Sequence, residues 1–141
     1  MPVEIVRVQP AAVDAFFRAH EREALKTFYN FSVIWHEQSH DIAAKNGDDV
    51  VGALRLRIAA SLAHIERVIV VPERRRQGIA RRLLDDAADI ANYYNCHKMT
   101  LLVPHRSAAQ TFFEACGFRE EAVLPQHTFK LDMSSMRKFL L

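Results

Sequence analysis

The chain has 141 residues, half of them hydrophobic and 26% charged, so we expect a single globular domain over residues 1–141. A formal net charge of +2 argues against a nucleic-acid partner, and no apolar run approaches the about 20 residues of a membrane span. The two cysteines have no framework spacing and the start lacks a signal-peptide core, which favours a cytoplasmic location.

The first part of the chain predicts a strand, a helical region and a group of strands. Residues 3–8 alternate weakly and end near Pro10, which is typical of a strand. From residue 11 to about 28, apolar residues recur at helical spacing, which one long or two short helices would explain. The Asn-Gly turn in NGDD favours a hairpin between the first two of three strand-like runs. These runs are residues 40–46, 50–58 and 62–71.

The second part alternates helices and strands. Amphipathic or apolar patterns predict helices over residues 79–95 and 107–115, with a strand over 98–103 between them. Short strands are expected at about 118–123 and 127–132, and SSMRKFLL at 134–141 is expected as a last helical turn. The order of these elements indicates an α/β fold with a mixed sheet.

The segment VIVVPERRRQGIARRLL, residues 68–84, has the clearest chemical signal. A β-branched strand runs through an arginine-rich turn and Gly78 into a helix. Backbone N–H groups and the helix dipole favour an anion at such a turn, and glycine lets it approach closely. The residues therefore predict a phosphate or pyrophosphate site, with a solvated basic face as the alternative.

Three features in this order resemble the GNAT superfamily of acyl-CoA-dependent N-acyltransferases. RRQGIA at residues 75–80 is similar to the family signature [Q/R]-x-x-G-x-[G/A]. The strand that ends at Pro72 looks like the family's central strand, and AAQTFFEACGF at 108–118 is similar to its A-x-x-F-Y-E-x-x-G-F helix. The resemblance covers most of the chain from about residue 40.

The resemblance implies a GNAT-like mixed, largely antiparallel central sheet flanked by helices. It implies an N-acetyltransferase that moves an acetyl group from acetyl-CoA directly to a primary amine, with no metal. A small-molecule acceptor is preferred because the compact chain has no obvious peptide-reading insertion. The alternatives are a protein N-terminus or lysine as acceptor, or a non-catalytic acyl-CoA-binding module. A homodimer is expected from the resemblance and the apolar tail MRKFLL.

The cofactor-binding residues also follow from the resemblance. Three strand residues would pair through their backbone with the pantetheine arm, and the following turn would cradle the pyrophosphate. The strand residues are Val68, Ile69 and Val70, and the turn residues are Arg75, Arg76, Gln77, Gly78, Ile79, Ala80 and Arg81. The two strands beside the cofactor are expected to part at residues 70–72 and 103–105, leaving a slot for the thioester.

His64 and Glu66 are the candidate catalytic residues. They lie two apart on a predicted strand, so both side chains point to one face, and either could take the amine proton directly or through water. The stretch HIERVIVV resembles glucosamine-phosphate N-acetyltransferases, which places Glu66 on a matching acid. The alternative is a solvated strand end without a catalytic role.

The group that protonates the departing thiolate is left open. The tyrosine of the family's F-Y-E motif falls on Phe113, which cannot supply a proton, and Arg106 replaces an asparagine frequent in the family. The proton could come from water or from His105, Ser107, Tyr93 or Tyr94, or the coenzyme thiol could leave as a thiolate stabilised by backbone N–H groups.

Two further features concern the acceptor side. HEQSH at residues 36–40 matches the H-E-x-x-H of zinc proteases, but that motif works only on a helix. On a strand the two histidines would be roughly 13 Å apart, and we expect His40 at a strand start. Arg55 and Arg57 share one strand face and could receive an anionic substrate group, although an exposed strand explains them equally well.

Overall fold

The structure is a computed structural model that describes residues 2–31 and 35–140. The chain forms two compact units, residues 1–34 and 35–141. A single domain over the whole chain therefore stays a prediction. No helix in the described part of the chain is long and apolar enough to cross a membrane.

The first unit contains one helix, α1 (Pro10–Leu25). Proline stands at its first turn, where a missing N–H costs no hydrogen bond. The helix predicted from residue 11 to about 28 is confirmed, with its end three residues earlier. The strand predicted at residues 3–8 is wrong, because no strand of the described chain pairs with this segment and alternation alone does not make a strand.

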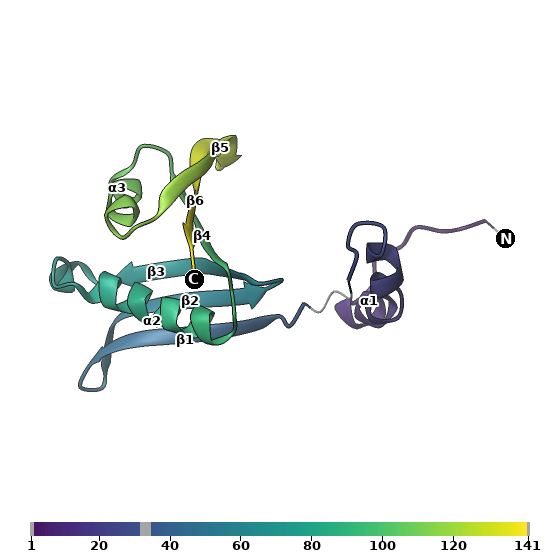
Figure 1. Ribbon diagram of the computed structural model, residues 1–141, viewed down its shortest axis with the longest axis horizontal. Helices are drawn as coiled ribbons and strands as arrows, with labels where there is room; N and C mark the ends of the chain where they lie inside the picture. The colour runs from purple at the N-terminus through teal and green to yellow at the C-terminus, as the bar shows by residue number, and fades with distance from the viewer. Residues whose placement is uncertain (1, 32–34, 141) are drawn as a thin grey trace. The chain divides into compact units, whose positions relative to one another are not determined.

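The second unit is built on a six-stranded sheet with the order β1-β2-β3-β4-β6-β5 (Figure 1). Its strands are β1 (Gln38–Asn46), β2 (Asp49–Ala59), β3 (Leu62–Val70), β4 (Lys98–Pro104), β5 (Arg119–Thr128) and β6 (Leu131–Phe139). All neighbours are antiparallel except the parallel pair of β3 and β4. A short 3-10 helix (Pro72–Arg74), α2 (Ile79–Tyr93) and α3 (Ala108–Ala115) complete the unit. The predicted α/β fold with a mixed, largely antiparallel sheet is confirmed.

The C-terminal segment differs from the prediction. The run expected as a strand at 127–132 contains the β5–β6 turn, where Phe129 and Lys130 have positive φ angles of 50° and 63°. The expected helical turn at 134–141 is wrong, because the tail lies as β6 between β4 and β5. Met136 pairs with Leu101 of β4 and is fully buried, so much of the apolar tail serves the sheet. The homodimer stays a prediction.

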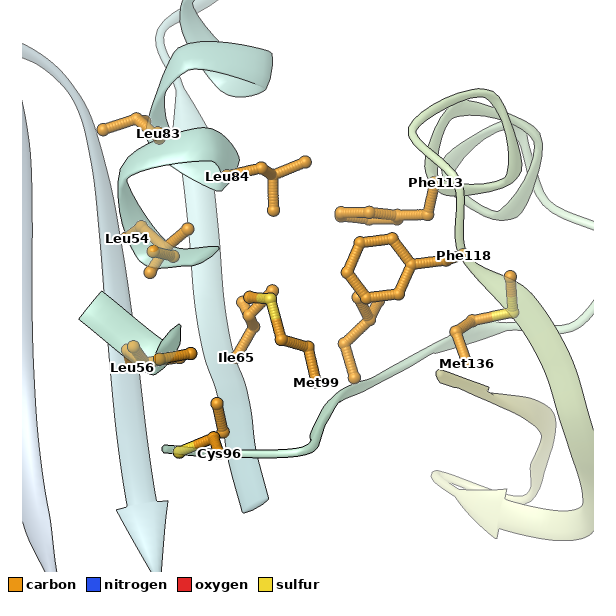
Figure 2. Packing of buried hydrophobic residues seen from close by; sticks show 14 of the residues in the cluster. Leu54, Leu56, Ile65, Leu83, Leu84, Cys96, Met99, Phe113, Phe118 and Met136 are labelled. Atoms are coloured by element: carbon orange, nitrogen blue, oxygen red, sulfur yellow. The ribbon is translucent and has the colours of Figure 1, made fainter. Parts of the chain in front are cut away.

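One face of the sheet forms the hydrophobic core with α2 and α3. Leu83, Leu84, Ala87 and Ala91 are the buried stripe of α2. Figure 2 shows Leu84 and Met99 facing Phe113 and Phe118, so the two helices share one cluster with β4. Burying each such side chain stabilises the fold by roughly 1.5–3 kcal/mol.

The opposite face of the sheet is polar, and neither α2 nor α3 covers it. Its residues alternate with the buried ones along β2, β3 and β4. We call this surface the polar face, and it includes Arg55, Arg57, His64, Glu66, Arg67 and Thr100.

Candidate active site

The parallel strands β3 and β4 stay together over only three rungs. Leu62, Ala63 and His64 pair with Lys98, Met99 and Thr100, and no later rung joins the two strands. Beyond His64, the β4-facing backbone groups of β3 are therefore available to a ligand that lies alongside as an extra strand. The parting begins earlier than residues 70–72 and 103–105, where the sequence placed it.

A β-bulge in β3 accompanies this parting. Arg67 pairs with Arg55 and Ile65 pairs with Leu56, which leaves Glu66 as the extra residue between them. A bulge bends its strand and increases the local twist, and such features recur beside active sites. Glu66 is exposed and His64 half-buried, while Ile65 between them is buried, so both predicted catalytic residues lie on the polar face.

A cleft of about 530 Å³ lies where the strands have parted. Its lining comes from the end of β3, the following turn, the start of α2 and one side of α3. All of the predicted cofactor-binding residues line this cleft except Gln77, which is exposed outside it. The lining also includes Arg74 of the arginine-rich turn and, from α3, Ala108, Ala109, Phe112 and Phe113. Of these, the sequence did not predict the two alanines at a ligand surface.

The turn between β3 and α2 is held in an unusual conformation. Arg76 and Gly78 have positive φ angles of 63° and 77°, and the left-handed region costs a non-glycine residue about 1–2 kcal/mol. The Arg75 Nε donates a hydrogen bond to the Val70 carbonyl oxygen at 3.2 Å, which ties the turn to the strand. A Cβ atom at Gly78 would meet no protein atom within 4 Å, so the space in front of this backbone is open.

The start of α2 favours an anion in this open space. Gly78 precedes the helix and has no side chain that could cap its first N–H groups. The helix dipole adds partial positive charge there, and four arginines surround the cleft. They are Arg74, Arg75, Arg76 and Arg81, and none of them forms an ion pair within residues 2–31 and 35–140.

His64 occupies the last rung before the strands part. Its Nδ1 lies 2.8 Å from the Thr100 Oγ1, a partner that the sequence did not reveal. Burial lowers the pKa of His64 below its ordinary value, and the nearby Arg57 guanidinium lowers it further, against a smaller opposing effect of Glu66. The imidazole is therefore held neutral near pH 7, as a proton acceptor requires.

The sequence matches the model of one protein family over most of its length. The model described as the acetyltransferase (GNAT) family matches residues 5–118. The chain is a GNAT acetyltransferase. Because it belongs to this family, it is an acyl-CoA-dependent N-acetyltransferase, as the resemblance implied. No curated protein matches its sequence significantly.

Solved structures share this fold at low sequence identity. An acetyltransferase from Bacillus cereus has a TM-score of 0.75 at 17% identity, with 97% of this chain and 98% of that chain covered. The ribosomal-protein-S18-alanine N-acetyltransferase from Escherichia coli has a TM-score of 0.65 at 16% identity over 95% and 91%. A chimeric spermidine N-acetyltransferase of Vibrio cholerae and hSSAT has a TM-score of 0.64 at 21% identity over 94% and 80%. At these identities the likeness shows the fold, and the names of these proteins differ in acceptor.

The second predicted catalytic residue of this GNAT acetyltransferase is engaged by a neighbouring strand. The Glu66 Oε1 lies 3.4 Å from the Arg57 Nε, and Arg57 stands opposite His64 on β2. The carboxylate is thus occupied by a guanidinium, whereas the imidazole faces a neutral hydroxyl. Of the two residues, His64 is better arranged to accept a proton.

None of the four side chains considered as proton donors lines the cleft. Tyr93 and Tyr94 lie at the far end of α2, about 20 Å from its first turn at 1.5 Å per residue. The Ser107 Oγ accepts a hydrogen bond from the Gln110 backbone N–H at 3.2 Å and caps α3. The His105 Nδ1 lies 2.9 Å from the Glu120 Oε1, which belongs to a structural network.

That network fastens α3 to the far strands. The Ser134 hydroxyl donates to the Glu120 carboxylate at 2.6 Å and lies 2.8 Å from the His105 Nδ1. The hydrogen bond from Ser134 is the main reason that the pKa of Glu120 is lowered. Gln110 of α3 also donates to Glu120, at 3.2 Å. Because Ser134 is fully buried and Gln110 nearly so, this network serves packing.

The H-E-x-x-H segment lacks the helix on which its chemistry depends. His40 lies in β1, and His36 precedes that strand with a positive φ of 46°. The His40 Nε2 lies 2.9 Å from the Gln38 side-chain oxygen, and its ring packs on Tyr94 with a centroid separation of 5.2 Å. Residues 2–31 and 35–140 hold no group of three His, Cys, Asp or Glu side chains that would suit a metal.

Proposed function

We propose that this GNAT acetyltransferase transfers an acetyl group from acetyl-CoA directly to a primary amine of a small molecule. The observation that carries the proposal is the cleft formed by the end of β3, the phosphate-type turn and α3, together with the neutral imidazole of His64 on the last rung before β3 and β4 part. The turn provides the anchor for an anionic cofactor, and His64 stands at the rung where the reacting groups would meet.

The cleft fits coenzyme A in shape and in charge. Its pyrophosphate would lie against the backbone of Gly78 and the first turn of α2, where the arginines neutralise it. Its pantetheine arm carries amides that would pair with the backbone of Val68–Val70, since β4 does not occupy that edge. Phe112 and Phe113 add an apolar wall on the opposite side.

The reaction forms one N–C bond and breaks one C–S bond. In the proposed step His64 accepts the proton of the attacking amine, directly or through a water molecule, while the acyl carbon leaves sulfur for nitrogen. Free β4-facing N–H groups of β3 would stabilise the charge that develops on the carbonyl oxygen. Because Phe113 replaces the family's tyrosine, the thiolate takes its proton from water.

A second acceptor class follows from a specific observation. The fold is shared with an enzyme named for ribosomal-protein-S18-alanine, so a protein N-terminus is a second candidate acceptor. The compact chain favours the small molecule.

Release of free coenzyme A thiol with a panel of primary amines tests the proposal. We expect amine-dependent release above the rate of acetyl-CoA hydrolysis, with the acetylated amine identified by mass. Tight binding of acetyl-CoA without turnover of any amine or peptide would overturn the proposal. Turnover of peptides alone would support the protein acceptor.

A further inference from the structure

We infer that the acceptor amine carries a carboxylate group and that Arg67 on the polar face binds it. The inference rests on the proposed function and adds the chemical class of the substrate. It begins from a second pocket on the polar face, beside the coenzyme cleft.

This pocket has a volume of about 320 Å³ and lies across three strands. One row of its lining is Asp41, Arg55 and Arg67, which stand opposite one another on β1, β2 and β3. The next row is Ala43, Ala53 and Ile69. The two alanines leave a depression, so the pocket has an apolar floor and a charged row along one side.

The charges of this row are unequal. The Arg55 guanidinium donates to both carboxylate oxygens of Asp41, at 2.8 and 3.1 Å, so this arginine already forms a bidentate ion pair. Arg57, one row further along, is paired with Glu66 at 3.4 Å. Arg67 forms no ion pair with any residue of the described chain.

The sum of these groups is one unbalanced positive charge. The cations Arg55, Arg57 and Arg67 face the two carboxylates of Asp41 and Glu66, while His64 is held neutral. A guanidinium binds a carboxylate through two parallel hydrogen bonds, so one carboxylate of the substrate would balance the group. The sequence offered Arg55 and Arg57 as candidates for such a role, with an exposed strand as an equal alternative, but their partners on the sheet leave the role to Arg67.

The pocket is placed to serve the transfer reaction. Ile69 lines both this pocket and the coenzyme cleft, so the two spaces share one residue. Arg57 is the β2 partner of His64 and Arg55 is the β2 partner of Arg67, so the two functional rows are two residues apart along β2. At 3.4 Å per residue this is about 7 Å, which an amino acid can span between an amine at His64 and a carboxylate at Arg67.

The same charge disfavours polyamines. A second ammonium group on the substrate would approach an unpaired guanidinium and be repelled, at a cost that grows when water is excluded. We therefore expect acceptor selectivity opposite to that indicated by the name of the spermidine N-acetyltransferase with the same fold.

The experiment compares matched amines that differ by one carboxylate, with the full chain as wild type, Arg67→Gln and Arg119→Gln. The panel holds amino acids, the corresponding amines without the carboxylate, aminoalkyl phosphates and spermidine. We expect wild type to have kcat/KM at least about ten-fold higher for the carboxylate member of a pair, the effect of one charge-assisted contact. Arg67→Gln should remove this ratio, while Arg119→Gln, an equal charge change on β5, should keep it.

Equal or better turnover of the carboxylate-free amines by wild type overturns the inference but supports the proposed function. A carboxylate preference that survives Arg67→Gln also overturns the inference and leaves the proposed function standing. A preference for the phosphate over the carboxylate has the same meaning. Calorimetric binding of the amino acids to the enzyme with coenzyme A measures the subsite without turnover. Loss of that binding in Arg67→Gln supports the inference even if His64 is not the base, and absence of binding to wild type overturns it.

Discussion

His64 and Thr100 form the last rung that β3 and β4 share, with 2.8 Å between the imidazole Nδ1 and the threonine Oγ1. When the Nδ1–H donates to this hydroxyl, the Nε2 keeps the lone pair that accepts a proton. The rung therefore places a neutral imidazole at the point where β3 and β4 part.

The first prediction concerns the pH dependence of catalysis. Since burial lowers the pKa of His64 below 6.5, the neutral imidazole should predominate above that pH and be lost as the pH falls through the lowered value. The rate at saturating substrate should fall on the acid side accordingly. His64→Gln should remove this limb and lower kcat by about 100-fold or more, the usual contribution of a general base.

Glu66→Gln is the matched control for this assignment. It should leave the acid limb in place, since Glu66 is engaged by Arg57. If the limb instead disappears in Glu66→Gln and persists in His64→Gln, the carboxylate is the base.

The second prediction assigns Thr100 a positioning role. Thr100→Val keeps the shape of the side chain but removes the hydroxyl beside His64, so the imidazole loses its fixed orientation. We expect kcat to fall by about ten- to hundred-fold, with the dissociation constant of acetyl-CoA unchanged. Thr100→Ser should restore most of the activity, and a failure of this rescue would contradict the role.

The third prediction compares two glycines with positive φ. Gly78 and Gly47 have φ angles of 77° and 63°, and a Cβ at either would meet no protein atom within 4 Å. Alanine at either position should therefore cost about 1–2 kcal/mol of folding free energy from backbone strain alone. Only Gly78→Ala should also weaken acetyl-CoA binding, because its methyl group would project into the space proposed for the pyrophosphate. Calorimetry with acetyl-CoA and urea unfolding separate the two effects, and equal affinities of the variants would refute the site.

The fourth prediction concerns the network under α3. Ser134→Ala removes a buried hydroxyl that donates to Glu120 and lies beside His105, so two polar groups lose a partner. We expect the free energy of unfolding to fall by about 1–3 kcal/mol in urea denaturation. Ser135→Ala, at the neighbouring and less buried position of β6, should change it much less. Similar losses in both variants would show that the network adds no stability.

Much of the fold and the coenzyme cleft could be predicted from the sequence because the decisive signals are local. The apolar stripe of α2, the Asn-Gly hairpin and the turn before Gly78 each lie within a few consecutive residues. Helix and turn formation depend on such short-range preferences. For that reason the lining that comes from β3, the turn and the start of α2 could be predicted from the motif RRQGIA and its flanking strand, whereas the two alanines that α3 adds could not.

Only the tertiary structure decided the pairings between residues that are far apart in the chain. β6 is a strand because β4 and β5 pair with it on both sides, whereas its sequence alone predicted a helical turn. Arg55 is neutralised by Asp41, fourteen residues away, so Arg67 is the arginine of the pocket on the polar face without an ion pair in the described chain. Cross-strand register brings such charges together or keeps them apart, and no short stretch of sequence contains it.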